Sequence, residues 1–373
     1  MVQRKYMMNT LKNEFALFIK GYFNDVYPDY VIKNKLEEEI PVFIYHHITQ
    51  HEFEDCLKHL FRNGYMTLTA DQYEQALSDR SSAPDRSVVI TFDDGLSDVY
   101  EAAYPLLRKY DFQAIVFLIP AWIGTPGIVT WEQVQEMHES GVIDFQSHSM
   151  HHPAIFCSDE IIDFYNPKME NLKRWNVPLI ESNEEKEITE RPALGTPIYE
   201  YCSRFSDTKR YYPDKKLQEI CVEHVTKKGA DKFFERKKWK SELEELVRNF
   251  RIMESVKDEY ETENKQITAI LKELRYSKLT IEEKLKDKKV RHFAFPWNQT
   301  GTVTTKVLVK SGYKTAYMGL TADALEGKKI KNPKLIKRVT GDFIKCLPGD
   351  GRQSFWSVLL HKILRRLKVG STY

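Results

Sequence analysis

Short apolar runs recur along this chain and alternate with segments of helical spacing. Runs of four to eight apolar or β-branched residues are typical of strands that are buried on both faces. The runs lie at residues 40–45, 65–69, 88–92, 114–119, 142–147, 290–295, 315–318 and 335–336. Strands that alternate with helices in this way predict an α/β architecture with a parallel sheet.

The alternation breaks between the runs at 142–147 and 290–295. A segment from about 156 to 262 is polar at first and then charged and helical, with an apolar stripe from Leu243 to Met253. It is too long for an ordinary crossover between strands. We therefore expect a large, mainly helical or irregular insertion at about 156–262 within a main domain at 40–345. Residues 1–39 are expected to form an N-terminal extension and residues 346–373 a C-terminal tail.

Unusual polar residues stand where four of the apolar runs end. They are His46, Asp93-Asp94, His148 and Trp297-Asn298. In parallel α/β folds the carboxyl ends of the strands share one face, and that face carries the functional site. An Asp-Gly pair after a strand is by itself most often an ordinary turn. Because four predicted strands all end in such polar residues, a functional site is favoured over an isolated turn.

The segment His148-Ser149-Met150-His151-His152-Pro153 is the second candidate. His148 and His152 are four residues apart, so a single helical turn would place both rings on one side. Pro153 would end that turn. Two imidazoles with one strand-end carboxylate would make a three-ligand metal set with an open position for water. The alternative is a polar loop with surface histidines.

Composition narrows the function classes. The chain has 373 residues, a net charge of +2, 42% hydrophobic residues and five cysteines. A net charge this close to zero does not indicate a nucleic-acid-binding protein. The scattered cysteines form no CxxC pair, which argues against a disulfide framework and a thiolate metal site. We find no secretory signal in residues 1–20 and no apolar stretch long enough to span a membrane, and so expect a cytoplasmic location.

Two motifs carry a resemblance to a known family. Thr91-Phe92-Asp93-Asp94-Gly95 and His148-Ser149-x-x-His152-Pro153 resemble the motifs of polysaccharide deacetylases of the NodB-homology type, carbohydrate esterase family 4. Residues 293–298 resemble the FAYPYG form of the third motif. Residues 40–48 resemble the N-terminal segment of poly-N-acetylglucosamine deacetylases. The resemblance covers about 40–156 and 262–340, and it implies a distorted (β/α) barrel.

The resemblance also implies a metal-dependent N-deacetylase of an N-acetylated sugar. Asp94, His148 and His152 would hold a divalent metal, most commonly zinc in relatives. Asp93 would be the general base. The late Leu-x-His motif of the family, whose histidine acts as the acid, has no convincing match. In the poly-N-acetylglucosamine deacetylases that residues 40–48 resemble, the N-terminal histidine takes this role, so the resemblance nominates His46 as the acid.

Three further residues are expected to assist. The arginine of the usual third motif is missing, and Arg338, near the end of a late strand, would orient Asp93 in its place. Pro296 and Trp297 would face the substrate, and the Trp297 backbone N–H is the candidate oxyanion donor.

Several alternatives stay open. An O-deacetylase or a deformylase would use the same site, and a catalytically inactive glycan-binding protein would retain the fold. A metal-dependent phosphatase is disfavoured because no glycine-rich phosphate loop accompanies the paired acids.

The tail is amphipathic and basic. Phe355, Leu359, Ile363, Leu364 and Leu367 fall near one face, as in an interfacial helix. The alternative is that the tail docks on the barrel or on a second copy of the chain. We expect a cytoplasmic enzyme that is peripheral at the inner membrane face and meets a lipid- or nucleotide-linked glycan.

Overall fold

The computed structural model describes residues 19, 21–23, 26–36, 39–169, 178, 192–254, 259–320 and 333–369. The chain divides into two compact units. The first comprises residues 1–151, 273–299 and 308–373, and the second comprises residues 152–272 and 300–307. Most of the N-terminal extension expected at 1–39 lies outside the described residues. The domain bounds expected from the sequence stay predictions.

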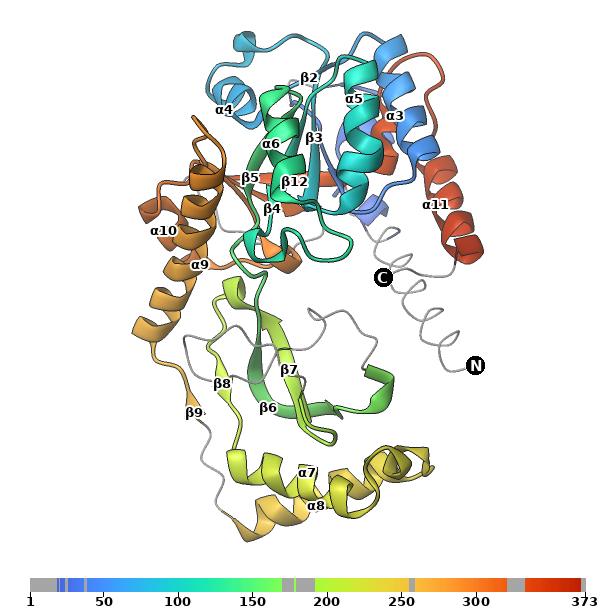
Figure 1. Ribbon diagram of the computed structural model, residues 1–373. Coiled ribbons are helices and arrows are strands. Elements are labelled where there is room, and N and C mark those ends of the chain that lie inside the picture. Colours follow the sequence, from blue (N-terminus) through green and yellow to red (C-terminus); the bar gives the residue numbers. More distant parts are fainter. Residues whose placement is uncertain are drawn as a thin grey trace. The chain divides into compact units, whose positions relative to one another are not determined.

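A closed parallel barrel forms the centre of the first unit (Figure 1). The strands follow the order β1-β12-β11-β10-β5-β4-β3, and β3 pairs with β1 to close the ring. Their bounds are Val42–Tyr45 (β1), Ser87–Asp94 (β3), Ala114–Leu118 (β4), Ile143–Ser147 (β5), His292–Ala294 (β10), Thr315–Gly319 (β11) and Lys334–Thr340 (β12). The short β2 (Met66–Thr67) pairs with β3 outside the ring. The predicted (β/α) barrel is confirmed.

The barrel strands are apolar because both of their faces are covered. Every residue of β4 is buried, as are all residues of β3 except Asp94. One face points into a barrel core that includes Val89, Phe117, Tyr317 and Ile336. The other face lies under helices, so water reaches these strands only at their ends.

Helices cover the outside of the barrel. Figure 1 shows α3, α5 and α6 beside its strands. The helices of the first unit are Asp29–Ile32 (α2), Gln50–Arg62 (α3), Ala70–Ser78 (α4), Tyr104–Lys109 (α5), Trp131–Glu139 (α6) and Phe355–Val369 (α11). Helices α9 (Glu263–Lys284) and α10 (Thr302–Lys310) each include residues of both units. Helix α9 begins in the second unit and enters the first at Glu273.

The second unit has its own hydrophobic core. Helices α7 (Lys215–Lys227) and α8 (Trp239–Met253) bury a cluster that includes Leu217, Val225 and Leu243. Two antiparallel strand pairs accompany them: β6 (Ala154–Phe164) with β7 (Pro197–Ser203), and β8 (Tyr211–Tyr212) with β9 (Glu259–Tyr260). The sequence did not predict these strands. The middle of β6 is polar and its register with β7 is irregular. The apolar and polar residues of β6 therefore do not alternate as they do in a regular strand.

Helix α11 packs against the rest of the first unit. Phe355, Val358 and Leu359 are buried. Lys362 and Arg365 both pair with Asp342, at 3.4 Å and 3.0 Å respectively. The docked alternative is therefore the one observed. The predicted apolar face is only partly buried: Phe355 and Leu359 are buried, whereas Leu364 is exposed. The Leu367 side chain lies outside the described residues.

Candidate active site

The end of β3 presents two carboxylates on a sharp turn. Asp94 and Gly95 both adopt positive φ, at 73° and 77°. Gly95 is required because a Cβ there would lie 2.8 Å from the Leu118 side chain. Asp93 is almost completely buried, whereas the Asp94 side chain retains 20% exposure. Consecutive strand residues point to opposite faces, so the two acids meet different surroundings.

Asp93 is locked to Arg338 of β12. The guanidinium donates to both carboxylate oxygens, over 2.6 Å and 2.7 Å, and Arg338 is 1% exposed. The same guanidinium donates to the Thr91 hydroxyl over 3.2 Å. Burial raises the pKa of Asp93, but the charge and hydrogen bonds of Arg338, together with the neighbouring His148 and His46, outweigh burial and lower the pKa to about 2. The structure thus brings together the two residues that the sequence paired, and Asp93 is ionised at neutral pH.

The two neighbouring histidines after β1 point to different partners. His46 Nε2 lies 4.0 Å from Asp93 Oδ2. His47 Nδ1 lies 3.2 Å from Asp98 Oδ2, and the same oxygen accepts a hydrogen bond from the Ile48 backbone N–H over 2.9 Å. Asp98 thereby anchors the segment after His46. Of the pair, His46 is the one placed beside Asp93.

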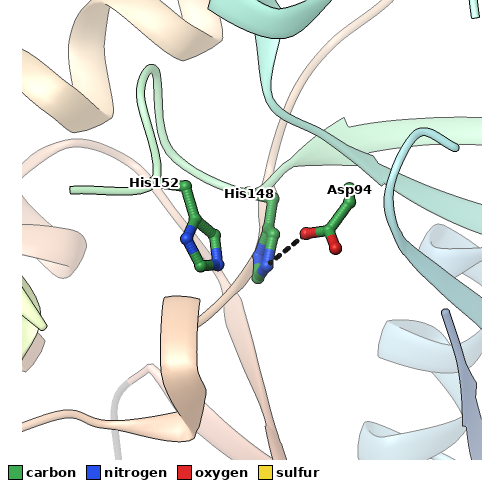
Figure 2. Close-up of side chains that lie close together, drawn as sticks. All are labelled: Asp94, His148 and His152. Carbon is green, nitrogen blue, oxygen red and sulfur yellow. Dashed lines mark ion pairs between the residues drawn. The ribbon is translucent and has the colours of Figure 1, made fainter. Parts of the chain in front are cut away.

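Asp94, His148 and His152 form a compact cluster of ligand atoms (Figure 2). One atom from each residue lies within 4.8 Å of the other two. His148 Nε2 and Asp94 Oδ1 are 3.4 Å apart. His148 Nδ1 lies 2.9 Å from the Ala294 carbonyl oxygen, which can only accept, so Nδ1 carries the proton. The other ring nitrogen, Nε2, faces Asp94 and is the atom that could bind a metal.

These residues fit a divalent cation. Asp94 Oδ1 is buried and makes no hydrogen bond to any residue that the structure describes. A buried carboxylate oxygen without a hydrogen bond is costly unless a cation compensates it. Two imidazoles and one carboxylate also make a ligand set that zinc accepts in catalytic sites, and the Ala294 carbonyl fixes the His148 tautomer as an outer partner of a metal ligand does.

The segment from His148 to His152 is a loop, so the predicted helical turn is wrong. Ser149 and His152 adopt positive φ, at 68° and 54°. Left-handed backbone at two non-glycine residues reverses the chain and brings the second ring back to the first. Residue type gives little warning of such a conformation, because positive φ is uncommon for any residue other than glycine, even though histidine adopts it more often than most.

Residues 296–298 follow β10, which is the neighbour of β5 in the barrel. Trp297 has φ 60° and ψ 12°, and Asn298 has φ 54°. The Asn298 side-chain oxygen accepts from the Gly319 N–H over 2.7 Å, which supports this turn. Pro296 and Trp297 thus lie on the same barrel end as His148. Their roles toward substrate stay predictions.

Another acidic cluster combines Asp71, Glu74 and His292. It lies at the start of β10, whereas His148 follows the end of β5. His292 Nε2 is 2.8 Å from Asp71 Oδ1, and the Arg291 guanidinium is 2.7 Å from the same oxygen. Because Arg291 already neutralises Asp71, this cluster is the poorer cation site.

The comparisons with known proteins concern the part of the chain that carries this site. Residues 80–189 match the profile of the family described as polysaccharide deacetylase. YxkH of Bacillus subtilis (strain 168), which carries a provisional polysaccharide deacetylase name, is 37% identical over 129 residues, or 32% of this chain and 46% of that protein. A poly-beta-1,6-N-acetyl-D-glucosamine N-deacetylase of Staphylococcus epidermidis is 33% identical over 107 residues, or 27% of this chain and 37% of that protein. The chain thus spans less than half the length of these two relatives.

Among solved structures, a de-N-acetylase from Aggregatibacter actinomycetemcomitans aligns with a TM-score of 0.50 at 17% identity, over 87% of this chain and 99% of that one. At this identity the likeness concerns the fold. The family profile spans the Asp93-Asp94 strand and the His148–His152 loop, where the barrel end gathers its ligand atoms. Residues 80–189, which include the Asp93-Asp94 strand end and the His148–His152 loop, therefore match the polysaccharide deacetylase family.

Proposed function

We propose that this protein is a metal-dependent hydrolase that removes the N-acetyl group from an N-acetylated sugar of a polysaccharide or glycan intermediate. The observation that carries the proposal is the barrel end, where the Asp94–His148–His152 cluster adjoins an ionised Asp93 held by Arg338. Amide hydrolysis at neutral pH requires an activated water, a proton acceptor and a proton donor. The described residues at this barrel end include a candidate for each requirement.

Asp94, His148 and His152 would hold the cation. A bound zinc-like ion supplies Lewis acidity that activates water and polarises the acyl oxygen. Asp93 receives the proton of the attacking water at a carboxylate oxygen. With a pKa of about 2 it is a weak base, so its contribution rests on orientation and on being ionised at every working pH.

His46 donates the proton to the departing amine in this proposal. It lies beside Asp93, and its side chain is 35% exposed, so solvent can reprotonate it after each turnover. An imidazole can both hold and release a proton, which suits the proton donor in this reaction. Trp297 is proposed to contribute its backbone N–H to the oxyanion.

The test substrate follows from the relatives, of which those in Escherichia coli and Staphylococcus epidermidis are named poly-beta-1,6-N-acetyl-D-glucosamine N-deacetylases. Zinc-loaded protein is incubated with oligomers of this polymer and with other N-acetylhexosamine glycans. The expected result is release of acetate with one new free amine per acetate, detected by mass spectrometry and amine labelling. Acetate without a new amine would indicate O-deacetylation. Formate release would indicate a deformylase.

A catalytically inactive glycan-binding protein is the rival from another class. Such a protein has no need of the metal, so its loss of zinc would leave glycan binding unchanged. Purified protein that binds the oligomers without releasing acetate, with or without zinc, would favour this rival.

The location at the inner membrane face is also a proposal. None of the helices among the described residues is both long and apolar enough to cross a bilayer. Helix α11 nevertheless exposes Trp356, Leu360 and Leu364, which are spaced four residues apart on one stripe. Co-sedimentation with anionic vesicles tests the stripe, and serine at these three positions should release the protein. Full-length protein that stays in the supernatant at low salt would refute membrane contact and leave the deacetylase proposal intact.

A further inference from the structure

The loop between the two histidine ligands is held by one carboxylate from helix α9. Glu273 Oε2 accepts hydrogen bonds from the Met150 N–H over 3.1 Å and the His151 N–H over 3.0 Å. Glu273 Oε1 lies 2.8 Å from His151 Nδ1. The Glu273 side chain is 15% exposed, so these contacts are largely shielded from water. Both carboxylate oxygens are thus engaged by the loop.

The next turn of α9 supports the start of the same loop. Ser277, which is fully buried, places its hydroxyl 2.7 Å from the Ser147 hydroxyl. Ser147 in turn accepts from the Ser149 N–H over 3.3 Å. Glu273 and Ser277 are four residues apart and share one face of the helix. The backbone N–H groups of all three residues between His148 and His152 therefore donate hydrogen bonds to side-chain oxygens.

This loop needs external support because its backbone is unfavourable. Ser149 and His152 adopt positive φ without being glycine. Such residues keep this conformation only where the surrounding structure enforces it. Without the carboxylate, the Met150 and His151 N–H groups would turn to water, and the loop would relax toward ordinary backbone angles. His152 would then leave its position near Asp94 and His148.

We infer that Glu273 is a positioning residue that holds His152 in the ligand geometry of the metal site. The inference deepens the proposed metal-dependent deacetylase and rests on it. Glu273 acts through the loop, because both of its oxygens are occupied by loop donors. A hydrogen-bonding partner behind metal ligands is worth about 10- to 100-fold in metal affinity in other proteins.

Zinc affinity of the full-length protein is the direct test. The metal-free protein competes with a chromophoric chelator for zinc, and wild type is compared with Glu273→Ala. Glu283→Ala is the matched control, because Glu283 is an exposed glutamate on the same helix. We expect Glu273→Ala to bind zinc about 10- to 100-fold more weakly and the control to bind as wild type does. Circular dichroism and thermal unfolding without metal establish that each variant is folded.

The conservative variant Glu273→Gln distinguishes a role in positioning His152 from a role in the stability of the whole fold. Glu273→Gln keeps the volume and one acceptor oxygen, so its zinc affinity should fall between those of wild type and Glu273→Ala. Folded Glu273→Ala with a zinc dissociation constant within about twofold of wild type would overturn the inference. If Glu273→Ala does not fold, Glu273→Gln decides, and an unchanged zinc affinity would overturn it equally. An equal loss in Glu283→Ala would do the same.

The zinc-affinity comparison can fail independently of the proposed deacetylase activity. Wild-type protein that binds zinc but releases no acetate from any N-acetylated sugar would refute the proposed activity and leave the zinc comparison valid. Wild-type protein that binds no zinc would overturn the inference itself.

Discussion

Replacing Arg338 with methionine removes the cation that pairs with the buried Asp93 carboxylate. The guanidinium makes two hydrogen bonds to the Asp93 carboxylate, of 2.6 Å and 2.7 Å, and both side chains are nearly inaccessible to water. Methionine has a comparable length and fills much of the same volume without charge or hydrogen-bond donors. Asp93 would then be a buried acid without its principal cation, while the strands around it keep their apolar contacts.

The magnitude follows from burial and from the pKa of Asp93. Removing one partner of a buried ion pair costs about 3–5 kcal/mol, because the remaining charge is uncompensated. The lowering of the Asp93 pKa from 3.8 to about 2 corresponds to roughly 2–3 kcal/mol of native stability at neutral pH. The remainder is the desolvation of a carboxylate that Arg338 no longer compensates. We expect Arg338→Met to unfold about 3–5 kcal/mol more easily near neutral pH.

The pH dependence gives the prediction its sign. In the wild type the folded pKa of Asp93 lies below its unfolded value, so its stabilisation is present above about pH 4 and is lost as the pH falls toward about 2. In Arg338→Met burial raises the pKa, so protonation on acidification relieves the strain of a buried charge. The difference in unfolding free energy between the two proteins should therefore shrink as the pH falls.

Urea unfolding in the presence of a chelator measures this difference without a contribution from bound metal. Arg338→Lys is the matched variant, because it keeps the charge but loses the two-pronged contact. It should lie between wild type and Arg338→Met. A difference between wild type and Arg338→Met that stays constant from about pH 8 to about pH 4 would refute the account of Asp93 as an ionised acid held by Arg338.

Three further predictions concern the site. His152→Ala should lose most bound zinc by elemental analysis and nearly all activity while its circular dichroism is unchanged; full metal occupancy would exclude it as a ligand. Asp93→Asn should bind zinc but hydrolyse about 100- to 10,000-fold more slowly, whereas Asp94→Asn should lose the metal, and equal metal loss in both would contradict this division. His46→Ala should keep zinc and slow the release of poor leaving groups most, while His47→Ala stays active; the reverse result would exchange their roles.

The barrel end could be predicted because parallel topology alone gathers strand ends. Asp93, Asp94 and His148 each follow an apolar run, and the rule that strand carboxyl ends share a face places them together from the sequence alone. The pairing of Asp93 with Arg338 was also foreseen, from the absence of an arginine in the third motif. Their contact over 245 positions follows from the closure of the barrel.

The supports of the site could not be predicted in the same way. Glu273 contacts a loop 122 residues earlier in the chain, and a glutamate on an amphipathic helix gives no local sign of such a partner. The positive φ angles of Ser149 and His152 have no glycine to announce them, so the four-residue spacing suggested a helix. The β6 and β7 strands were missed because charged residues interrupt their alternation.

The closure of the barrel has a consequence for the order of folding. Strand β1 pairs with β12, which joins Phe43 to Val339, and the Tyr45 hydroxyl donates to the Gly341 carbonyl 296 positions away. Contacts between such distant segments form late, because a long loop must close before they contribute. The second unit consists mainly of the continuous stretch 152–272 and has its own core, so it can be complete while the ring is still open.

Arg338 arrives on that last strand. A nascent chain that has synthesised β3 but not β12 contains Asp93 without its counterion, and such a carboxylate stays hydrated or protonated. Burial of the β3 end is therefore coupled to synthesis of the final strand. A ribosome-bound chain truncated before β12 should keep the Asp93 end of β3 accessible to water, while the core of the second unit is already protected from proteolysis.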